Sequence, residues 1–238
     1  MEKALAPLTF LLCLTFAGST LWVPDFGGFD ANQFPVPQDN PPVQPAGYAF
    51  AIWGIIYLWL LIGMGFGLLK RRSDPDWQAM RKPLIVSLAI GSIWLPVAVL
   101  SPVWAAILIW AMLIPALMAL FEAPRSDRYW AAAPLGLYAG WLSAASCVAL
   151  GLVAAGYGFT SEFTAAFGFV FLALVIASAV QNQLKRAPTY GISVIWALVA
   201  IVVQNLSTEP TIAALAGGGA LALVAPVWKA WRYDSAAV

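Results

Sequence analysis

The stretch Pro42–Trp59 reads PVQPAGYAFAIWGIIYLW and places a proline-rich segment directly before an apolar run. That run continues from Ala49 to Leu69 without a charged residue. A run of 18 or more such residues is long enough to cross a bilayer as a helix. We expect Pro45 and Gly47 to set the entry into this helix, because proline is tolerated at a helix start, where its missing N–H matters little.

The whole chain has the composition of an integral membrane protein. Of its 238 residues, 62% are hydrophobic and only 10% are charged. A soluble domain cannot bury so much apolar surface, because even large folds expose a good share of their residues. The sequence therefore predicts an all-α membrane protein with eight transmembrane helices, at 5–24, 48–69, 83–100, 103–121, 130–154, 163–182, 188–206 and 211–229.

The positions of the basic residues predict the topology. All twelve lie before the first segment or after the second, fourth, sixth and eighth: Lys3, Lys70, Arg71, Arg72, Arg81, Lys82, Arg125, Arg128, Lys185, Arg186, Lys229 and Arg232. The loops 25–47, 101–102, 155–162 and 207–210 contain none. Lys and Arg collect on the cytoplasmic side. We therefore expect a multi-pass protein of the cytoplasmic (inner) membrane with both termini in the cytoplasm.

Two features of this layout leave alternatives open. The first segment is either a membrane helix or a cleaved signal peptide, since Lys3 precedes an apolar run with small residues at 17–19. Whether residues 1–20 are retained is thus open. The external loop 25–47 is either a solvated connector or a lid over a cavity, because a loop of this length between helices is often functional.

Several classes of function are disfavoured by what the chain lacks. It has no histidine, which removes the commonest metal ligand and general base. Proton-coupled transporters generally keep ionisable residues at mid-membrane. No acidic residue of this chain lies deep in an apolar segment. We expect no catalytic residue, no metal and, at a net charge of +1, no nucleic-acid partner. Gly63, Gly67 and the glycines at 217–219 lack phosphate-loop context and predict close helix contacts instead.

Tryptophan is abundant, with twelve residues, and the depths of these residues differ. Trp53, Trp94 and Trp110 fall five to seven residues inside the external helix ends, or roughly 8–10 Å deep at the helical rise, and Trp141 lies nearer mid-membrane. Trp77 is expected in a cytoplasmic loop. Aromatic rings at similar depth on separate helices form either ordinary packing or the wall of a pocket for a planar hydrophobic ligand.

Three motifs, in order, carry a resemblance to a known family. PAGYAFAIWGIIY contains Pro45, Gly47, Tyr48, Phe50, Trp53 and Tyr57; LAIGSIWLPV contains Trp94 and Pro96; YAGWLSAAS contains Tyr138 and Trp141. With the long loop after the first helix, they resemble the TspO/MBR family of tryptophan-rich sensory proteins, also called translocator protein or peripheral benzodiazepine receptor. An eight-helix branch, whose members also read Pro-Ala-Gly-Tyr-x-Phe-x-Ile-Trp-Gly, is more similar.

The resemblance implies a division of the chain and a binding site. Residues 1–158 would form the TspO-like five-helix bundle, and 159–238 would add three helices that the five-helix proteins lack. An outward-facing pocket would bind a tetrapyrrole such as protoporphyrin. The implied ligand-binding residues are Tyr48, Trp53, Tyr57, Trp94, Pro96, Tyr138 and Trp141. The chain departs from the family pattern at Gly91 and Ala149, where the pattern has asparagine, and the loop lacks the family's tryptophans.

We therefore expect a non-enzymatic membrane protein that senses or transports a hydrophobic planar molecule. Its partners would be that ligand and membrane lipids, with a homodimer or association with a larger membrane complex left open. One alternative is an accessory or assembly subunit of a pigment or redox complex, with no ligand of its own. Another is an enzyme that modifies pigment or lipid, which the absence of histidine and buried carboxylates disfavours.

Overall fold

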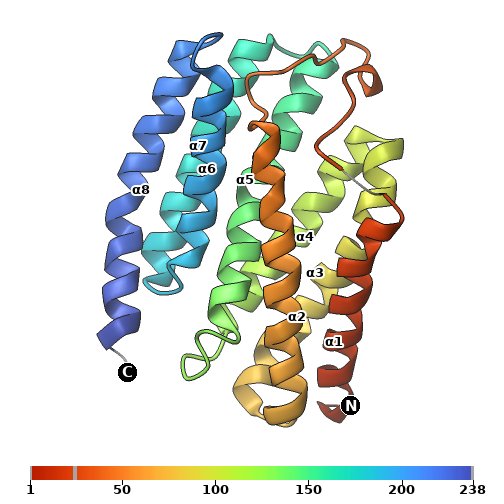
Figure 1. Cartoon of the computed structure of the whole chain (residues 1–238), viewed down its shortest axis with the longest axis vertical. Helices are drawn as coiled ribbons and strands as arrows, with labels where there is room; N and C mark the ends of the chain where they lie inside the picture. Colours follow the sequence, from red (N-terminus) through yellow and green to blue (C-terminus); the bar gives the residue numbers. More distant parts are fainter. Residues whose placement is uncertain (1, 24–25, 237–238) are drawn as a thin grey trace.

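A computed structural model describes residues 2–23 and 26–236, which form eight α-helices arranged as an up-and-down bundle (Figure 1). Their bounds are α1 Glu2–Gly18, α2 Ile52–Lys70, α3 Pro75–Leu100, α4 Pro102–Glu122, α5 Ala132–Gly156, α6 Glu162–Leu184, α7 Thr189–Asn205 and α8 Pro210–Ala236. Three short 3₁₀ helices, Ser19–Leu21, Ala31–Gln33 and Gly47–Ala51, lie between α1 and α2. The described residues contain no strand. The all-α prediction is confirmed.

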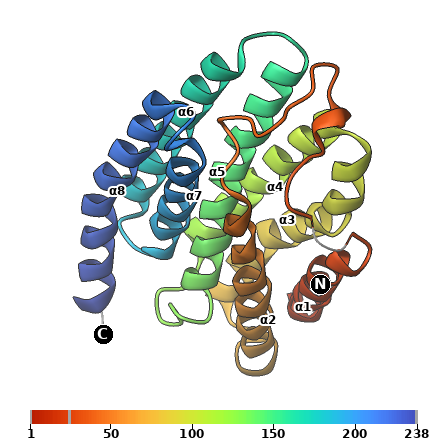
Figure 2. The same ribbon diagram turned by 45° about the horizontal axis from the view of Figure 1, so that its top comes forward.

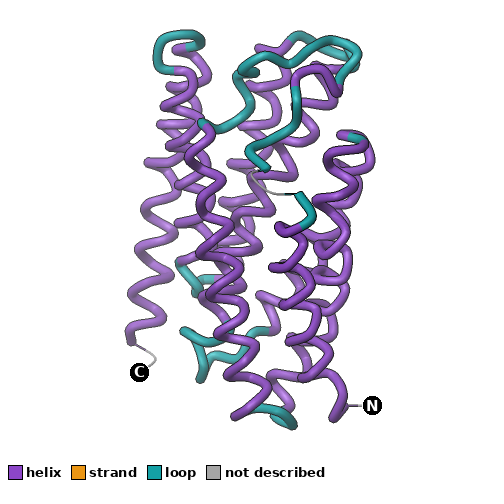
Figure 3. The backbone as a smooth tube through the Cα atoms, turned by 45° about the vertical axis from the view of Figure 1, so that its right-hand side comes forward, coloured by secondary structure: helices purple, strands orange, loops and turns teal. Residues whose placement is uncertain are grey.

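Seven of these helices are long and apolar enough to cross a membrane, and α7, with 17 residues, is a shorter apolar helix. At 1.5 Å per residue α7 spans about 26 Å, close to the hydrocarbon thickness of a bilayer. α1 begins and α8 ends at the same end of the bundle (Figures 1 and 3). An even number of alternating helices gives this arrangement.

The two ends of the bundle carry different charges. The long loop between α1 and α2 and the starts of α6 and α8 lie at one end, which carries Asp30, Asp39, Glu162 and Glu209 and no lysine or arginine. We call this the acidic end. All twelve lysines and arginines belong to the opposite end by the helices and turns that carry them, and we call it the basic end.

α3 begins earlier than its apolar run indicates, and this corrects the placement of Trp77. The helix starts at Pro75, and the Asp74 side chain caps it by accepting hydrogen bonds from the N–H groups of Asp76 and Trp77 at 3.0 and 3.3 Å. Trp77 is therefore helical and fully buried, not in a loop. Its Nε1 donates to Asp127 Oδ2 at 2.8 Å, and Arg71 Nε donates to the same oxygen at 2.8 Å.

α5 is the central helix of the bundle, with α6, α7 and α8 on one side and α3 and α4 on the other (Figure 2). In its most apolar stretch 72% of the residues are buried, more than in any of the other six long helices. Gly136 and Gly140 permit the close approach of α7, since a Cβ at either position would collide with Thr189 or Tyr190. The predicted role of Gly63 is similar, because a Cβ there would meet the Trp130 carbonyl.

The long loop, residues 26–46, runs across the acidic end in an irregular path (Figure 3). Hydrogen bonds fix it to three helices. Gln33 Nε2 donates to the carbonyls of Ala98 and Val99 at the end of α3. Val36 N–H donates to Gly156 O at the end of α5, and Ala46 N–H donates to Ala200 O in α7. The part of the loop before Gln33 carries Phe26 and Phe29, which point inward.

Candidate functional site

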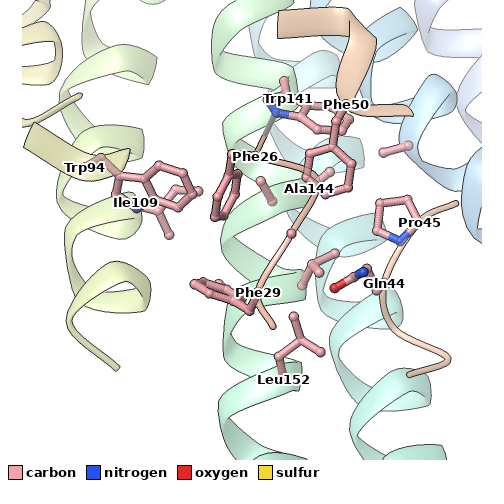
Figure 4. Close-up of a pocket in the computed structure, with 15 residues that line it drawn as sticks. Phe26, Phe29, Gln44, Pro45, Phe50, Trp94, Ile109, Trp141, Ala144 and Leu152 are labelled. Atoms are coloured by element: carbon pink, nitrogen blue, oxygen red, sulfur yellow. The ribbon is translucent and has the colours of Figure 1, made fainter. Parts of the chain in front are cut away.

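A cavity lies beneath the long loop, in the half of the bundle nearer the acidic end (Figure 4). The small-residue face of α5 forms one wall, and α3, α4 and α7 contribute one residue each. The loop contributes Phe26, Phe29, Gln44 and Pro45, which lie beside α5 (Figure 4). The full lining is Phe26, Gly28, Phe29, Gln44, Pro45, Phe50, Trp94, Ile109, Trp141, Ala144, Ala145, Val148, Ala149, Leu152 and Ala197.

The cavity is small with the loop in this position. Its volume is about 50 Å³. Pockets for small molecules usually range from about 300 to 1,000 Å³. Phe26 and Phe29 take up part of the remaining volume, and their rings meet edge to face at 6.0 Å. A ligand larger than a few atoms would have to displace them.

Two polar groups interrupt the apolar lining. The indole Nε1 of Trp141 is buried and has no hydrogen-bond partner among the described residues. The side chain of Gln44 likewise lines the cavity and makes no hydrogen bond within the part of the chain described. No charged side chain is present among the described lining residues. A buried N–H without an acceptor costs about 1–3 kcal/mol, so an acceptor on a bound molecule would recover that free energy.

Of the seven residues implied by the resemblance, Trp94 and Trp141 line the cavity. Trp94 is fixed on α3 by a hydrogen bond from its Nε1 to the carbonyl of Ala105 on α4, at 2.9 Å. Its ring meets Phe26 edge to face at 5.4 Å. Trp141 meets Phe50 in the same way at 5.9 Å. Trp94 thus contacts the long loop through Phe26, and Trp141 contacts the 3₁₀ helix before α2 through Phe50.

Trp53, Tyr57 and Tyr138 come together behind the cavity rather than on its wall. Phe16 of α1 lies among them, with ring centroids 5.9, 5.0 and 5.6 Å from those of the three residues. Trp53 stacks on Tyr57 and reaches Trp141 edge to face at 6.2 Å. Phe16 therefore fills the space that these three rings would otherwise enclose, and Trp141 separates this aromatic cluster from the cavity.

Tyr48 and Pro96 lie elsewhere. Tyr48 is 46% exposed and packs edge to face on Trp196 of α7 at 5.5 Å. Pro96 is half-buried within α3 and does not contribute to the cavity lining. The cavity brings Trp94 and Trp141 together and leaves the other five implied residues outside it.

Several lining residues could not be identified from the sequence. Phe26 and Phe29 belong to the long loop, and their inward direction depends on contacts with α3 that the sequence does not indicate. The α5 face of Ala144, Ala145, Val148, Ala149 and Leu152 carries a detectable signal, because small residues recur at a spacing of three or four. Within the described residues no three His, Cys, Asp or Glu side chains gather as metal ligands.

Comparison with known families yields one match. Residues 31–228 match the family described as TSPO-like protein, and this match continues through α6 and α7 into α8. No curated protein and no solved structure matches the chain. The matched family is a membrane family of sensory or transport type and is generally non-enzymatic. Since the match covers most of the sequence, the chain belongs to the TSPO-like protein family.

Proposed function

We propose that this protein is a receptor or transporter for a planar hydrophobic molecule, bound in the cavity beneath the long loop. A tetrapyrrole is the ligand class that the family resemblance favours. The observation that carries the proposal is the buried Nε1 of Trp141, which has no hydrogen-bond partner among the described residues and lies in a mostly apolar lining. A flat ring system with a hydrogen-bond acceptor would supply apolar contact and the missing partner together.

The long loop would act as the lid of this cavity. Its later part is held by hydrogen bonds to α3, α5 and α7, whereas Phe26 and Phe29 in its earlier part contact the cavity through their rings alone. Rotation of these two side chains away from Trp94 would enlarge the cavity from about 50 Å³ toward the volume that a small-molecule ligand needs.

The charge distribution supports one orientation in the membrane. All lysines and arginines belong to the basic end, so by the positive-inside rule that end, with both termini, would face the cytoplasm. The long loop and the cavity opening would then face outward across the inner membrane. α7 would complete the eighth crossing, consistent with its position between α5 and α8.

Titration with protoporphyrin, followed by tryptophan quenching in detergent, tests the binding proposal. Trp141→Leu and Trp94→Leu should each weaken binding about tenfold, since an aromatic contact and, for Trp141, a hydrogen bond are lost. Trp104→Leu is the matched control, because Trp104 is 60% exposed at the start of α4 and does not line the cavity. Equal affinity in all three variants would reject this site.

A further inference from the structure

Two further cavities lie at the basic end of the bundle, away from the long loop and the cavity beneath it. One, of about 210 Å³, is bounded by Trp59 of α2, Ile192 of α7 and Trp231 of α8. The other, of about 330 Å³, lies beside the loop between α4 and α5 and is lined by Arg125, Arg128 and Arg186. The two cavities share Arg128, Tyr129 and Asp234, so they form one continuous cleft.

The arginines give this cleft an excess of positive charge. Three arginines line the second cavity against one carboxylate, that of Asp234. The Asp234 side chain accepts a hydrogen bond from the Ala187 N–H at 2.9 Å. Both ion pairs found within the described residues involve Arg71, so none of the three cleft arginines is paired with a carboxylate there.

Arg186 is the buried member of this group, only 7% exposed. Its guanidinium donates to the carbonyls of Leu120, Phe121 and Ala123, at the end of α4. These three hydrogen bonds go to neutral carbonyl groups and do not neutralise the charge of Arg186. Burial, and secondly the positive charge of Arg125, lower the pKa of Arg186, while Asp234, Tyr233 and Glu122 act in the opposite direction. An anion in the cleft would stabilise this charge.

Arg125 and Arg128 are the arginines that an incoming anion can reach. Arg125 is exposed, and its one hydrogen bond within the described residues is a long one, 3.4 Å, to Tyr233 Oη. Arg128 lies over the Tyr129 ring at 4.6 Å and donates to the Tyr129 hydroxyl and the Asp234 carbonyl. The adjacent Ser126 is also exposed and lines the same cavity. Two guanidinium groups and a hydroxyl thus converge on one space.

The neighbouring apolar cavity suits a hydrocarbon chain. Trp59 and Trp231 form its sides, and Trp59 is fixed by a hydrogen bond from Nε1 to the Tyr129 carbonyl at 2.9 Å. Ile192 and Trp231 are 42% and 55% exposed, so the cavity is open on the surface between α2 and α8. Trp231 lies near the end of α8, and indole rings at helix ends prefer the membrane interface, where headgroup and hydrocarbon meet.

We propose that this cleft binds one anionic phospholipid, with its phosphodiester at Arg125 and Arg128 and the start of an acyl chain between Trp59 and Trp231. Arginine recognises phosphate oxygens through charge-assisted, often bidentate hydrogen bonds. Basic pockets between membrane helices on the cytoplasmic side are suited to anionic headgroups. The juxtaposition of an unpaired arginine group and an aromatic slot distinguishes this cleft from a merely basic surface.

The test counts lipids retained by the full-length protein in native mass spectrometry after titration in dodecyl maltoside. Dioleoylphosphatidylglycerol should bind at least tenfold more tightly than dioleoylphosphatidylcholine. Arg125→Gln should weaken phosphatidylglycerol binding about fivefold, and Ser126→Asp should weaken it at least as much by repulsion. Arg72→Gln is the matched control, since Arg72 is exposed at the same end but does not line the cleft. Equal binding of the two lipids, or no effect of Arg125→Gln, would overturn the proposal.

Two further arms separate a lipid from a free anion. Trp231→Ala should weaken phosphatidylglycerol binding while leaving the arginines in place. Inorganic phosphate should not displace the bound lipid at comparable concentration, because it lacks the chain that fills the slot. Displacement by phosphate, or binding unaffected by Trp231→Ala, would assign the cleft to a soluble anion and overturn the lipid assignment. The four residues changed in these experiments, Arg72, Arg125, Ser126 and Trp231, are exposed, so the variants should fold.

Discussion

The ring of Phe16 lies directly against Gly91, where a Cβ would come within 2.7 Å of the phenylalanine Cε2. Gly91 is one of the positions at which the family pattern has asparagine. Its lack of a side chain lets α1 place Phe16 among Trp53, Tyr57 and Tyr138. The glycine at position 91 therefore makes room for Phe16, and Phe16 in turn fills the aromatic cluster.

Replacing Phe16 with alanine should open this cluster. The loss of a buried phenylalanine should cost about 3 kcal/mol of stability. It should also expose Trp53 and Tyr57 to a ligand that passes Trp141, and so increase protoporphyrin affinity and the extent of quenching. Phe10→Ala is the matched control, since Phe10 lies on α1 outside the ring cluster. Thermal unfolding and titration measure the two effects, and unchanged affinity would mean that the cluster does not communicate with the cavity.

Gln33→Ala should loosen the lid. The change removes two hydrogen bonds from Nε2 to the carbonyls of Ala98 and Val99, at 3.0 and 2.9 Å, and a third from the Asp30 N–H to Oε1, at 2.9 Å. Each bond contributes about 1 kcal/mol. Stopped-flow mixing with protoporphyrin should therefore show a several-fold faster association rate. Gln183→Ala, an exposed glutamine at the basic end, should leave that rate unchanged. A slower rate would contradict the lid.

The charge of the ligand should affect its binding at the acidic end. Asp30, Asp39, Glu162 and Glu209 lie there without a lysine or arginine, and no charged side chain is found among the described lining residues. Protoporphyrin carries carboxylates, so its neutral dimethyl ester should bind several-fold more tightly at low ionic strength. The difference should shrink as salt screens the repulsion. A preference for the free acid that grows at low salt would contradict this expectation.

Gly140→Ala should destabilise the fold by separating α5 from α7, because the added methyl group would collide with the Tyr190 carbonyl. We expect a loss of about 2 kcal/mol, comparable to overpacking in a tight core. Gly168→Ala on α6 is the control, since nothing lies within 4 Å of a Cβ at that position. The two unfolding transitions in detergent, compared side by side, check the prediction. Equal stability would show that the α5–α7 contact can relax.

The helix order could be predicted because run length and charge position are local properties of the chain. The resemblance to the TspO/MBR family, carried by Trp53, Trp94 and Trp141 in order, is confirmed by the family match. The wall of the cavity could not be predicted as well. Which aromatic residues face it depends on Phe16, which comes from another helix, and on Phe26, whose direction is decided by its contact with Trp94. The prediction that Trp77 lies in a loop was wrong because the first turns of α3 carry charged residues, so the apolar run begins later than the helix.

The enclosure of α5 has a consequence for any attempt to shorten the protein. A chain cut at residue 158, the boundary predicted between the five-helix part and the rest, would lose α6 and α7 from the flank of its central helix. The notches at Gly136 and Gly140 would then face lipid, and the hydroxyl of Ser143 would lose its 3.0 Å contact with Tyr190 Oη. Shortened versions of this protein should therefore keep α6, α7 and α8 together with the first five helices.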